Sequence, residues 1–419
     1  MRIAMITNNY RPFVGGVPVS VERQAQELVK AGHEVTVFAP SYEGMDLKDE
    51  GAPERVVRYR SSAGKMKNGM VYPPLYPPEI FQTFEKEAFD CIHVHHPMFA
   101  GQWALYLGRK YGIPVIYTYH TKYEDYLHYL PIFGKRNSVL SETAEKAARH
   151  VIPKYMKWFA NQCDLVFAPS KGIQAALTDA GVVSEVEVFP TGLAEDFFVR
   201  DVDKCKEIRK KYGKGKPYML ITVSRLEEEK NYGFLFRGIA ELKHRIGDCF
   251  ELLVVGDGSQ ASELRTRVNM LEIADVVTFT GNVKNEEVKH YLGAADAFVF
   301  ASRSETQGIV LAEAMAAGCP VTAVRATGTE DIVKDGINGF LTEENEAEWA
   351  ERTEEILLAQ RHGEMRRAAF AYAQNYRASE LAVREANLYQ ESISGKRKRE
   401  GKEHEGREYR QDYAPISFY

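Results

Sequence analysis

The sequence predicts an α/β protein made of two doubly wound parallel-sheet domains. Short runs of β-branched and aromatic residues alternate with longer segments of helical periodicity, which is the pattern of repeated βαβ units. This alternation breaks once, around 190–200, where turn residues follow a strand, and then starts again. A chain of 419 residues also exceeds one ordinary core, so two domains of about 200 residues each are expected.

Each half of the chain supplies its own predicted strands. In the first half they are RIAMIT, EVTVFA, CIHVH, PVIYTY, DLVFAP and EVEVFP, with helical patterns between them, for example over 17–31 and 143–161. In the second half they are YMLITVS, FELLVVG, VVTFTG, AFVFAS and PVTAV. Ligands of doubly wound sheets bind outside the carboxyl ends of the strands, so the loops after these strands are where a site is expected.

The predicted domain boundaries follow from these elements. One Rossmann-like domain covers 1–192 and a second covers 193–376. The amphipathic segment 377–394 is a predicted helix that either caps the second domain or crosses back onto the first. The tail 395–419 mixes both charge signs without an apolar face, so it is predicted to be disordered.

Composition narrows the function classes. With 44% hydrophobic and 27% charged residues and a net charge of −5, the chain gives no support for a nucleic-acid binder. Five cysteines without a CxxC pair favour a reduced, cytoplasmic compartment. The N-terminus lacks the apolar core of a signal peptide, and no run approaches the roughly 18 apolar residues of a membrane span. Any membrane contact is therefore expected to be peripheral.

The segment 101–160 differs in charge from the rest of the chain. It carries nine basic and four acidic residues in a protein of net charge −5. Within it, the predicted helix 134–162 mixes Lys and Arg with Tyr, Trp and Phe. This mixture is typical of a helix on an anionic membrane surface, although an ordinary solvated helix has a similar composition.

The segment 302–321 carries the strongest functional signal. Glu305 and Glu313 lie eight residues apart, with Gly308 between them before a helical pattern. The N–H groups at a helix N-terminus attract anions, and carboxylates hold sugar hydroxyls. On one helix the two glutamates would be about 12 Å apart, too far for the carboxylate pair of a glycosidase, at about 5–5.5 or 6.5–9.5 Å. The pattern favours a nucleotide-sugar site; the alternative is a helix cap plus a surface glutamate.

Two basic residues follow the first strand of the second half. Arg225 and Lys230 lie in VSRLEEEKN, 223–231, where Arg can clamp a diphosphate with two hydrogen bonds and Lys can act as a point charge. Fixed cations there would stabilise a leaving nucleoside diphosphate without a metal. A solvated basic loop is the alternative.

The first half contributes a glycine pair and several histidines. Gly15 and Gly16 allow close approach of a ligand before a helix, but the motif is not GxGxxG, which disfavours a dinucleotide-dependent dehydrogenase.

The histidines at 93, 95 and 96 lack acidic or CxxC partners for a metal, so no metal is predicted. His120 ends a strand, where it either faces a donor sugar or is a core histidine. The GDG at 256–258 is predicted to be a simple turn.

Together these motifs resemble those of retaining glycosyltransferase family four, whose members have the GT-B fold of two facing Rossmann-like domains. The resemblance covers nearly the whole chain. The segments HTKYEDYLHY and ETQG are similar to those of bacterial 1,2-diacylglycerol 3-α-glucosyltransferases. The motifs that carry it are NNYRPFVGGV, His120-Thr121, SRLEEEKN, FTGNV and the E-x7-E of Glu305 and Glu313.

The resemblance implies a role for each position. Glu313 matches the glutamate that holds the donor ribose, Glu305 the one at the transferred sugar, and His120 the histidine that faces this sugar. Arg225 and Lys230 match the pair on the diphosphate, and Gly16 matches the glycine loop beside the phosphate. The backbone of 308–310 matches a segment near the donor, and Val283 matches the backbone position that meets the nucleotide base. The segment PTGLAEDF departs from the pattern of the family, because it has Thr191 where relatives often have an asparagine before the glycine. The catalytic residues implied are Glu305, His120, Arg225 and Lys230, and the substrate-binding residues are Gly15, Gly16, Val283, Gln307, Gly308, Ile309, Val310 and Glu313.

The resulting hypothesis is a retaining hexosyltransferase that needs no metal or other cofactor. It would move glucose from UDP-glucose to diacylglycerol at the inner, cytoplasmic face of the cell membrane, with an anionic membrane surface as partner. One alternative is the same chemistry with a soluble sugar or phospholipid acceptor and a UDP- or GDP-sugar donor. Another is a nucleotide-sugar-binding protein without catalytic activity.

Overall fold

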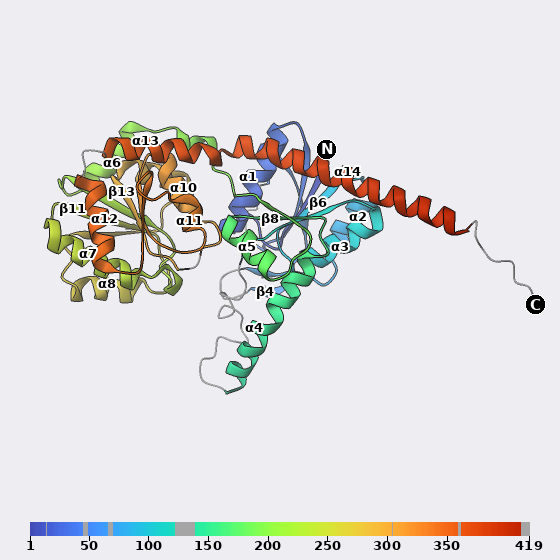
Figure 1. The fold of residues 1–419 in the computed structure, drawn as a ribbon, viewed down its shortest axis with the longest axis horizontal. Coiled ribbons are helices and arrows are strands. Elements are labelled where there is room, and N and C mark those ends of the chain that lie inside the picture. The colour runs from blue at the N-terminus through green and yellow to red at the C-terminus, as the bar shows by residue number, and fades with distance from the viewer. Residues whose placement is uncertain are drawn as a thin grey trace, which may run out of the picture. The chain divides into compact units, whose positions relative to one another are not determined.

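A computed structural model of the chain contains two compact units, each with its own parallel sheet (Figure 1). Unit 1 comprises Met1–Ala168, Gln174–Phe189 and Ser379–Tyr419, and unit 2 comprises Pro169–Ile173 and Pro190–Ala378. The structure describes residues 1–13, 15–44, 49–65, 70–121, 139–303, 305–358 and 362–411, with the backbone alone at 63–65, 139–147, 149 and 397–411.

Unit 1 is built on a seven-stranded sheet in the order β3-β2-β1-β6-β7-β8-β9, in which every pairing is parallel. The order reverses between β1 and β6, where Ile3 lies opposite Cys91. A short antiparallel pair, β4 and β5, stands apart from this sheet. The strands are β1 (Arg2–Ile6), β2 (Glu34–Pro40), β3 (Arg55–Tyr59), β4 (Ser62–Lys65), β5 (Val71–Tyr72), β6 (Cys91–Val94), β7 (Val115–Thr118), β8 (Leu165–Ala168) and β9 (Glu185–Val188).

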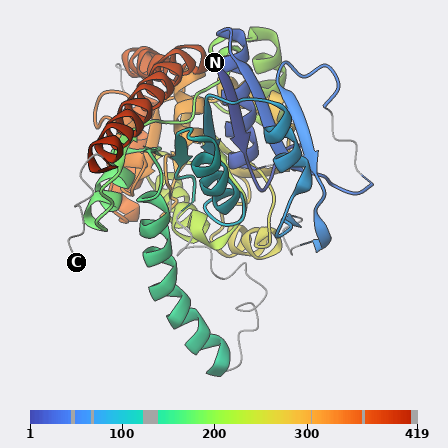
Figure 2. The ribbon, with the colours of Figure 1, turned by 90° about the vertical axis from the view of Figure 1, so that its right-hand side faces the viewer.

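Helices cover this sheet. The first half of α4 points away from the sheet in both Figure 1 and Figure 2, whereas Phe159 near its end is fully buried. A glycine, Gly101 in α3, permits this packing, because a Cβ there would lie 2.6 Å from the Phe159 ring. The helices of the first half of the chain are α1 (Gly16–Lys30), α2 (Pro78–Lys86), α3 (Ala100–Tyr111), α4 (Val139–Ala160) and α5 (Lys171–Asp179). The last helix is α14 (Ala378–Gln411).

Unit 2 repeats the same plan with a six-stranded parallel sheet in the order β12-β11-β10-β13-β14-β15. Its order reverses between β10 and β13, where Leu220 lies opposite Ala297. The strands are β10 (Tyr218–Val223), β11 (Phe250–Val255), β12 (Val277–Gly281), β13 (Ala297–Phe300), β14 (Val321–Val324) and β15 (Gly339–Thr342).

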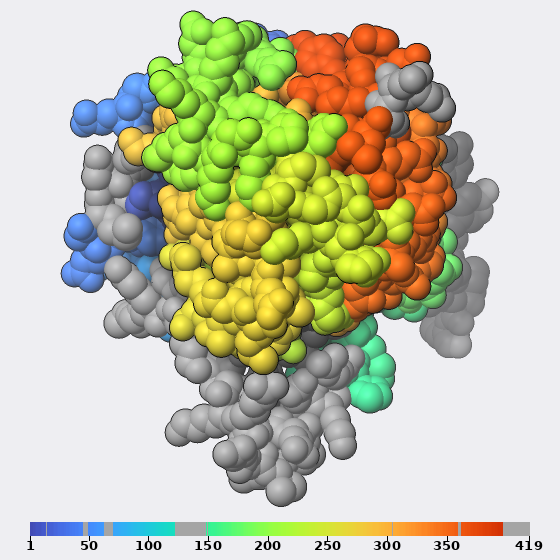
Figure 3. Space-filling model, turned by 90° about the vertical axis from the view of Figure 1, so that its left-hand side faces the viewer, coloured from blue at the N-terminus to red at the C-terminus, as the bar shows by residue number. Residues whose placement is uncertain are grey.

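The helices of unit 2 lie on both faces of its sheet. Figure 3 looks onto this unit and shows residues of α6 in green, α8 in yellow and α12 in orange at its surface. Trp349 of α12 is fully buried against α7. The elements are η2 (Glu195–Phe198), α6 (Val202–Tyr212), η3 (Glu228–Lys230), α7 (Tyr232–Ile246), α8 (Ala261–Met270), α9 (Asn285–Ala294), α10 (Ile309–Ala316), α11 (Thr329–Ile332), α12 (Glu346–Leu358), α13 (His362–Ala373) and η4 (Gln374–Tyr376).

The predicted α/β class and the two doubly wound parallel sheets are confirmed. Every predicted strand is present. Most of them are central strands, which are buried on both faces and read as continuous apolar runs. Four further strands, β3, β4, β5 and β15, were not predicted. β3 reads RVVRY and is only partly buried, β4 and β5 form the short pair apart from the main sheet, and β15 is four residues long and begins at Gly339, so none of them has a long apolar run.

The chain divides between Phe189 and Pro190, and its last helix belongs mostly to unit 1. Leu381, Tyr389 and Ile393 of α14 are buried in the core of that unit. The helix continues to Gln411, so the prediction of disorder is wrong for 395–411. Lys, Arg, Glu and Gln, which dominate this stretch, are good helix formers that need no apolar face to extend an existing helix. Residues 412–419 lie outside the described residues.

Candidate active site

In unit 2, the loops that follow β10 and β13 meet where the strand order reverses. β10 and β13 are neighbours in the sheet. Arg225 and Lys230 follow β10, and Glu305 follows β13. This is the topological switch point at which doubly wound sheets bind ligands, so the topology brings these three predicted residues to one edge.

Lys230 and Glu305 form a close, largely buried ion pair. The Lys230 Nζ lies 2.6 Å from the Glu305 Oε1, and the two side chains are 13% and 15% exposed. The ammonium also lies 5.9 Å from the centre of the Phe300 ring. An ammonium group carries three protons, so Lys230 can orient Glu305 and still contact an anionic ligand.

The loop that carries Arg225 and Lys230 is held against the segment after β13. The Ser302 hydroxyl and the Arg303 backbone N–H both donate to the Glu229 carbonyl, at 3.3 and 3.2 Å. The Arg225 guanidinium pairs with the Glu229 carboxylate at 3.0 Å and remains 54% exposed. The cationic loop and the acidic segment are therefore positioned together.

Gly308 forms the turn that starts α10. Its φ of 74° lies in the left-handed region, which glycine adopts without strain. Gly328 packs on the same turn, because a Cβ there would lie 3.0 Å from the backbone of Glu305 and Gln307. Ile309 and Val310, which were predicted to approach the donor with their backbone, are the first residues of α10.

Gln307 has a structural partner that the sequence did not indicate. Its side-chain oxygen accepts from the Thr191 N–H at 2.8 Å, and its amide nitrogen donates to the Thr191 carbonyl at 3.1 Å. The neighbouring Thr306 carbonyl accepts from the Ser170 hydroxyl at 2.7 Å. The amide of Gln307 therefore fixes the turn before α10, and its predicted contact with substrate stays a prediction.

The two glutamates of the E-x7-E motif have different surroundings. Glu305 precedes α10, whereas Glu313 lies within the helix and is half-buried. Val283, predicted to meet the nucleotide base through its backbone, follows β12 and packs partly buried against the core of unit 2. The GDG at 256–258 directly follows β11, and a Cβ at Gly256 would lie 2.0 Å from the Ser224 carbonyl oxygen.

In unit 1, the histidines lie at the carboxyl ends of β6 and β7. His95 follows β6, His120 follows β7, and the His95 Nδ1 lies 2.9 Å from the His120 Nε2. His96 accepts from the Asn8 backbone N–H at 3.2 Å, and Asn8 follows β1, the neighbour of β6. The switch point of unit 1 is thus lined by imidazoles.

These imidazoles are neutral at neutral pH. Burial holds the pKa of His120 well below its ordinary value, with a further lowering from His96 and His93. Burial and the neighbouring histidines act in the same direction on the pKa of His95, and burial lowers the pKa of His96 to about 4. His120 is therefore suited to act as a hydrogen-bonding group and not as a cation.

The protein leaves room at the predicted glycine pair. A Cβ at Gly16, the first residue of α1, would meet no atom within 4 Å, and one at Gly15 would lie 3.3 Å from Phe13. Packing inside the protein thus does not require glycine at position 16. Residue 14 lies outside the described residues.

A buried polar chain in unit 1 was missed by sequence reasoning. The Tyr389 hydroxyl donates to Glu385 at 2.6 Å and lies 2.6 Å from the His93 Nδ1. The other nitrogen of His93 lies 2.6 Å from the Thr118 hydroxyl. No local spacing could indicate this, since His93 and Tyr389 are 296 residues apart. Among the described residues, no group of three or more His, Cys, Asp or Glu has the arrangement of a metal site.

Comparison with family models gives two adjoining matches. Residues 14–197 match the model "Glycosyltransferase Family 4", and residues 204–376 match "Glycosyl transferases group 1". The two models together cover both sheets except β1, and they include Arg225, Lys230, Glu305 and His120.

Several characterised proteins are similar over most of the chain. The alpha-monoglucosyldiacylglycerol synthase of Streptococcus pneumoniae is 32% identical, covering 81% of this chain and 75% of the relative. The enzyme of the same name from Acholeplasma laidlawii is 26% identical, covering 83% and 86%. A GDP-mannose-dependent alpha-(1-6)-phosphatidylinositol monomannoside mannosyltransferase of Mycolicibacterium smegmatis is 28% identical, covering 81% and 84%.

Solved structures with the same fold include Anabaena Alr3699/HepE in complex with UDP and glucose, with a TM-score of 0.71 at 19% identity over 93% of this chain and 100% of the other. Sucrose-phosphate synthase from Thermosynechococcus elongatus has a TM-score of 0.74 at 20% identity, over 94% and 99%. These likenesses establish the GT-B fold. The chain belongs to glycosyltransferase family 4, and it is a nucleotide-sugar-dependent hexosyltransferase.

Proposed function

We propose that this glycosyltransferase moves glucose from UDP-glucose to diacylglycerol, with retention of the anomeric configuration, at a membrane surface. The observation that carries the proposal is the similarity, over more than 80% of the chain, to two enzymes named alpha-monoglucosyldiacylglycerol synthase from different organisms. The proposed acceptor also agrees with the ETQG segment beginning at Glu305.

Unit 2 would bind the nucleotide sugar and stabilise its leaving group. As the bond between the sugar and the diphosphate breaks, negative charge grows on the phosphate oxygens. Lys230 and Arg225 would meet this charge, and preorganised charges of this kind cost no reorganisation during the reaction. We propose that these cations make a metal ion or other cofactor unnecessary.

Lys230 would contact the diphosphate of the donor and also orient Glu305 toward the donor sugar. Its pairing with Glu305 at 2.6 Å supports a role in which the ammonium touches the diphosphate while Glu305 accepts hydroxyls of the sugar. Glu313, farther along α10, would hold the ribose. His120 would act on the sugar as a neutral imidazole, which its lowered pKa favours.

A lipid acceptor requires access to a bilayer surface. None of the helices in the described part of the chain combines the length and hydropathy of a membrane span. We therefore infer peripheral association with an anionic membrane, supported by the basic balance of 101–160.

The test is transfer from a panel of donors to defined lipids. Purified protein would be incubated with UDP-glucose, UDP-galactose or GDP-mannose and vesicles that contain diacylglycerol, and the products would be identified by mass and by the anomeric proton coupling. We expect an α-glucosyl lipid from UDP-glucose without added divalent cation. Transfer only to a soluble acceptor, or dependence on a divalent cation, would refute that part of the proposal.

A second candidate is mannosyl transfer from GDP-mannose to a phosphatidylinositol-type lipid. It is favoured by the similarity to the mannosyltransferase from Mycolicibacterium smegmatis at 28% identity. The same panel separates the two, because this candidate predicts a mannolipid from GDP-mannose and no product from UDP-glucose.

A further inference from the structure

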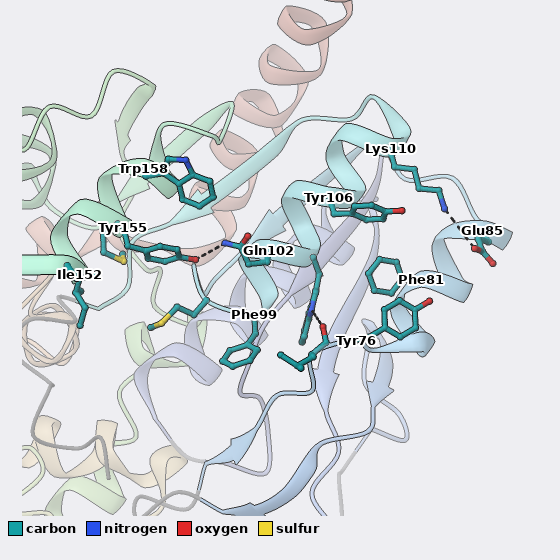
Figure 4. Close-up of a pocket in the computed structure, with 15 residues that line it drawn as sticks. Tyr76, Phe81, Glu85, Phe99, Gln102, Tyr106, Lys110, Ile152, Tyr155 and Trp158 are labelled. Carbon is teal, nitrogen blue, oxygen red and sulfur yellow. Dashed lines mark hydrogen bonds and ion pairs between the residues drawn. The ribbon is translucent and has the colours of Figure 1, made fainter. Parts of the chain in front are cut away.

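Unit 1 has a large apolar groove that the proposed donor chemistry does not use. The cavity measures about 990 Å³ and is bounded by the segment before α2, by α2 and α3, and by the second half of α4. In Figure 4, Ile152, Tyr155 and Trp158 of α4 lie on one side, and Tyr76 and Phe81 lie on the other. Its volume is at the upper end of ordinary small-ligand sites.

The lining offers almost nothing to a polar ligand. Besides the tyrosine hydroxyls and the tryptophan N–H groups, only Glu85, Gln102 and Lys110 bring polar groups to the fifteen residues that line it. The amide of Gln102 donates to the Tyr155 hydroxyl at 2.7 Å, and that hydroxyl donates to the Pro97 carbonyl at 2.8 Å. Lys110 and Glu85 lie 3.9 Å from each other. Because these polar groups already contact protein partners, the groove fits an apolar ligand.

Exposed apolar side chains are concentrated here. The described residues contain sixteen large, exposed hydrophobic side chains, and seven of them line this groove. Leu75 is 90% exposed and Tyr106 is 55% exposed. Contiguous apolar patches of this kind mark sites of interaction with a partner, a ligand or a membrane.

The groove is preorganised, because its exposed residues are held by specific contacts. The Trp103 indole N–H donates to the Leu75 carbonyl at 3.2 Å. The rings of Tyr76 and Phe81 stack with centres 4.6 Å apart. Phe99 has a φ of 59° and a ψ of −82°, a rarely populated positive-φ conformation that costs of order 1–3 kcal/mol for a residue with a side chain.

The α3 and α4 walls of the groove are basic, whereas the α2 wall carries Glu79 and Glu85 beside Lys86. α3 carries Arg109 and Lys110 and no acidic residue, and the segment 151–160 of α4 carries Lys154 and Lys157 and no acidic residue. A second hollow of about 510 Å³ shares residues with the groove and adds Arg109. Aromatic residues beside lysines and arginines favour the interface of an anionic bilayer.

The groove begins close to the histidine cluster of unit 1. Met98, one of its lining residues, follows His95 by three positions, so their Cα atoms are at most about 11 Å apart. The Met98 carbonyl accepts from the Asn8 amide at 2.8 Å, and the Asn8 N–H donates to His96. One wall of the groove is thus fixed to the histidine cluster that contains His120.

We propose that this groove binds an acyl chain of the acceptor lipid. The chain would lie along the aromatic walls, while Arg109, Lys110 and Lys154 contact the phosphates of neighbouring anionic lipids in the bilayer. The identity of the lipid as the acceptor rests on the proposed function. The binding of an acyl chain rests on the groove alone.

The tryptophans of the protein report directly on this proposal. Of the three in the chain, Trp103 and Trp158 line the groove, and Trp349 is fully buried in unit 2. Diacylglycerol with bromine on its acyl chains, carried in vesicles of phosphatidylcholine and phosphatidylglycerol, would quench tryptophans that touch the chain. We expect quenching in the full-length protein and a smaller effect in Trp158→Phe.

The decisive variant places charge in the groove without disturbing the core. Leu75→Glu with Tyr106→Glu changes two exposed residues, and the matched control Val183→Glu with Met270→Glu changes two exposed residues that do not line the groove, at 85% and 79% exposure. We expect the groove variant to lose the quenching and to raise the KM for long-chain diacylglycerol at least about tenfold, since several buried methylenes lose their contacts. Transfer to a short-chain, water-soluble diacylglycerol should stay within about twofold, and the control should match the parent protein.

The outcomes separate the two proposals. Quenching without glucosylation of diacylglycerol would support the groove and refute the acceptor. Glucosylation with no quenching, or with quenching that survives in the groove variant, would overturn the groove and leave the acceptor standing. A groove variant that changes the oligomeric state without changing the quenching would show that a second copy of the chain covers this face, which also overturns the proposal.

Discussion

The ion pair between Lys230 and Glu305 fixes the orientation of both side chains in the proposed site. Two charges held at 2.6 Å and mostly shielded from water orient each other, and removing either one leaves its partner without compensation. The residues come from different loops, after β10 and β13. Their proximity is a property of the parallel sheet, which places the two strand ends side by side.

Replacing the lysine tests this contact. We expect Lys230→Ala to lower kcat by about 10² to 10³ with any acceptor, which is the usual effect of removing one preorganised group at a developing charge. The matched control is Lys206→Ala, a lysine of unit 2 that is 74% exposed and 3.9 Å from Asp203. Steady-state transfer by both variants is the measurement, and parent-like kcat for Lys230→Ala would remove this residue from the proposed mechanism.

The buried histidines predict a pH dependence of stability. The folded-state pKa of His95, His96 and His120 is below the unfolded value of 6.5. Between pH 6.5 and about 4, the value for His96, the unfolded chain therefore binds more protons than the folded chain. The stabilisation is complete above pH 6.5 and is lost as the pH falls below it.

Denaturant unfolding at pH 7, 6 and 5 measures this effect. Each such histidine adds up to about 1.4 kcal/mol per pH unit to the slope of the unfolding free energy. We expect His96→Gln to be less stable at pH 7 but to have a shallower slope between pH 6.5 and 5. An unchanged slope in His96→Gln would show that this residue takes up no additional proton on unfolding.

At the residue scale, the sequence located the functional residues that follow strand ends. It did not reveal contacts between residues that only the tertiary fold brings together. The pairing of a cation from one loop with Glu305 from another is expected once both are placed after strands. The contact of Gln307 with the backbone of Thr191 was not expected, because sequence spacing carries no information on which backbone groups remain to be satisfied. The same holds for His93 and Tyr389.

Among the elements, α10 depends most on one backbone conformation. Its N-cap, Gly308, has a φ of 74°, and a Cβ there would lie 3.3 Å from Leu311 and 3.4 Å from the Gly328 carbonyl oxygen. A side chain at this position must shift the turn that holds Glu305 and the first residues of α10. The position of Glu305 and the start of α10 therefore depend on the same turn.

Gly308→Ala separates backbone strain from function. We expect a loss of roughly 1–2 kcal/mol in unfolding free energy together with a large loss of transfer activity. The matched control is Gly336→Ala, since Gly336 has a φ of 70° and no atom within 4 Å of an added Cβ. The control should lose similar stability and keep its activity; equal activity in both variants would contradict the role given to this turn.

The elements themselves were largely predictable from the sequence. Central strands were identified because they are apolar throughout. β3 was missed because it is only partly buried, and β15 was missed although it is buried, because its four residues, GFLT, begin with glycine and end with threonine. The length of α14 was underestimated for a different reason. Its end lacks an apolar face, yet favourable helix propensity extends a helix that packing in unit 1 has already nucleated.

At the scale of the whole molecule, the last helix completes the first unit. Tyr389 of α14 lies between Glu385 and His93 of β6, with 2.6 Å to each. All three side chains are buried. Because the Glu385 carboxylate can only accept, Tyr389 donates to it, which leaves the tyrosine oxygen to accept from the His93 Nδ1–H. The other His93 nitrogen lies 2.6 Å from the Thr118 hydroxyl.

Tyr389→Phe tests whether this link stabilises unit 1. Loss of the hydroxyl leaves buried polar groups without a partner, at a cost of about 1–3 kcal/mol. Hydrogen exchange followed by mass spectrometry should show faster exchange in peptides of unit 1, with unit 2 unchanged. The control Tyr372→Phe removes a 2.7 Å bond to the Asp331 carbonyl in unit 2 and should have the reverse pattern, so an identical response of both units to Tyr389→Phe would contradict the assignment.

The return of α14 to unit 1 has a consequence for synthesis on the ribosome. Unit 2 is formed by Pro169–Ile173 and Pro190–Ala378, so it is translated before the part of α14 that packs on unit 1. Unit 1 lacks Tyr389 and Ile393 in its core until unit 2 has been translated. Domains generally fold as they emerge, so unit 2 is expected to complete its core on the ribosome before unit 1 does.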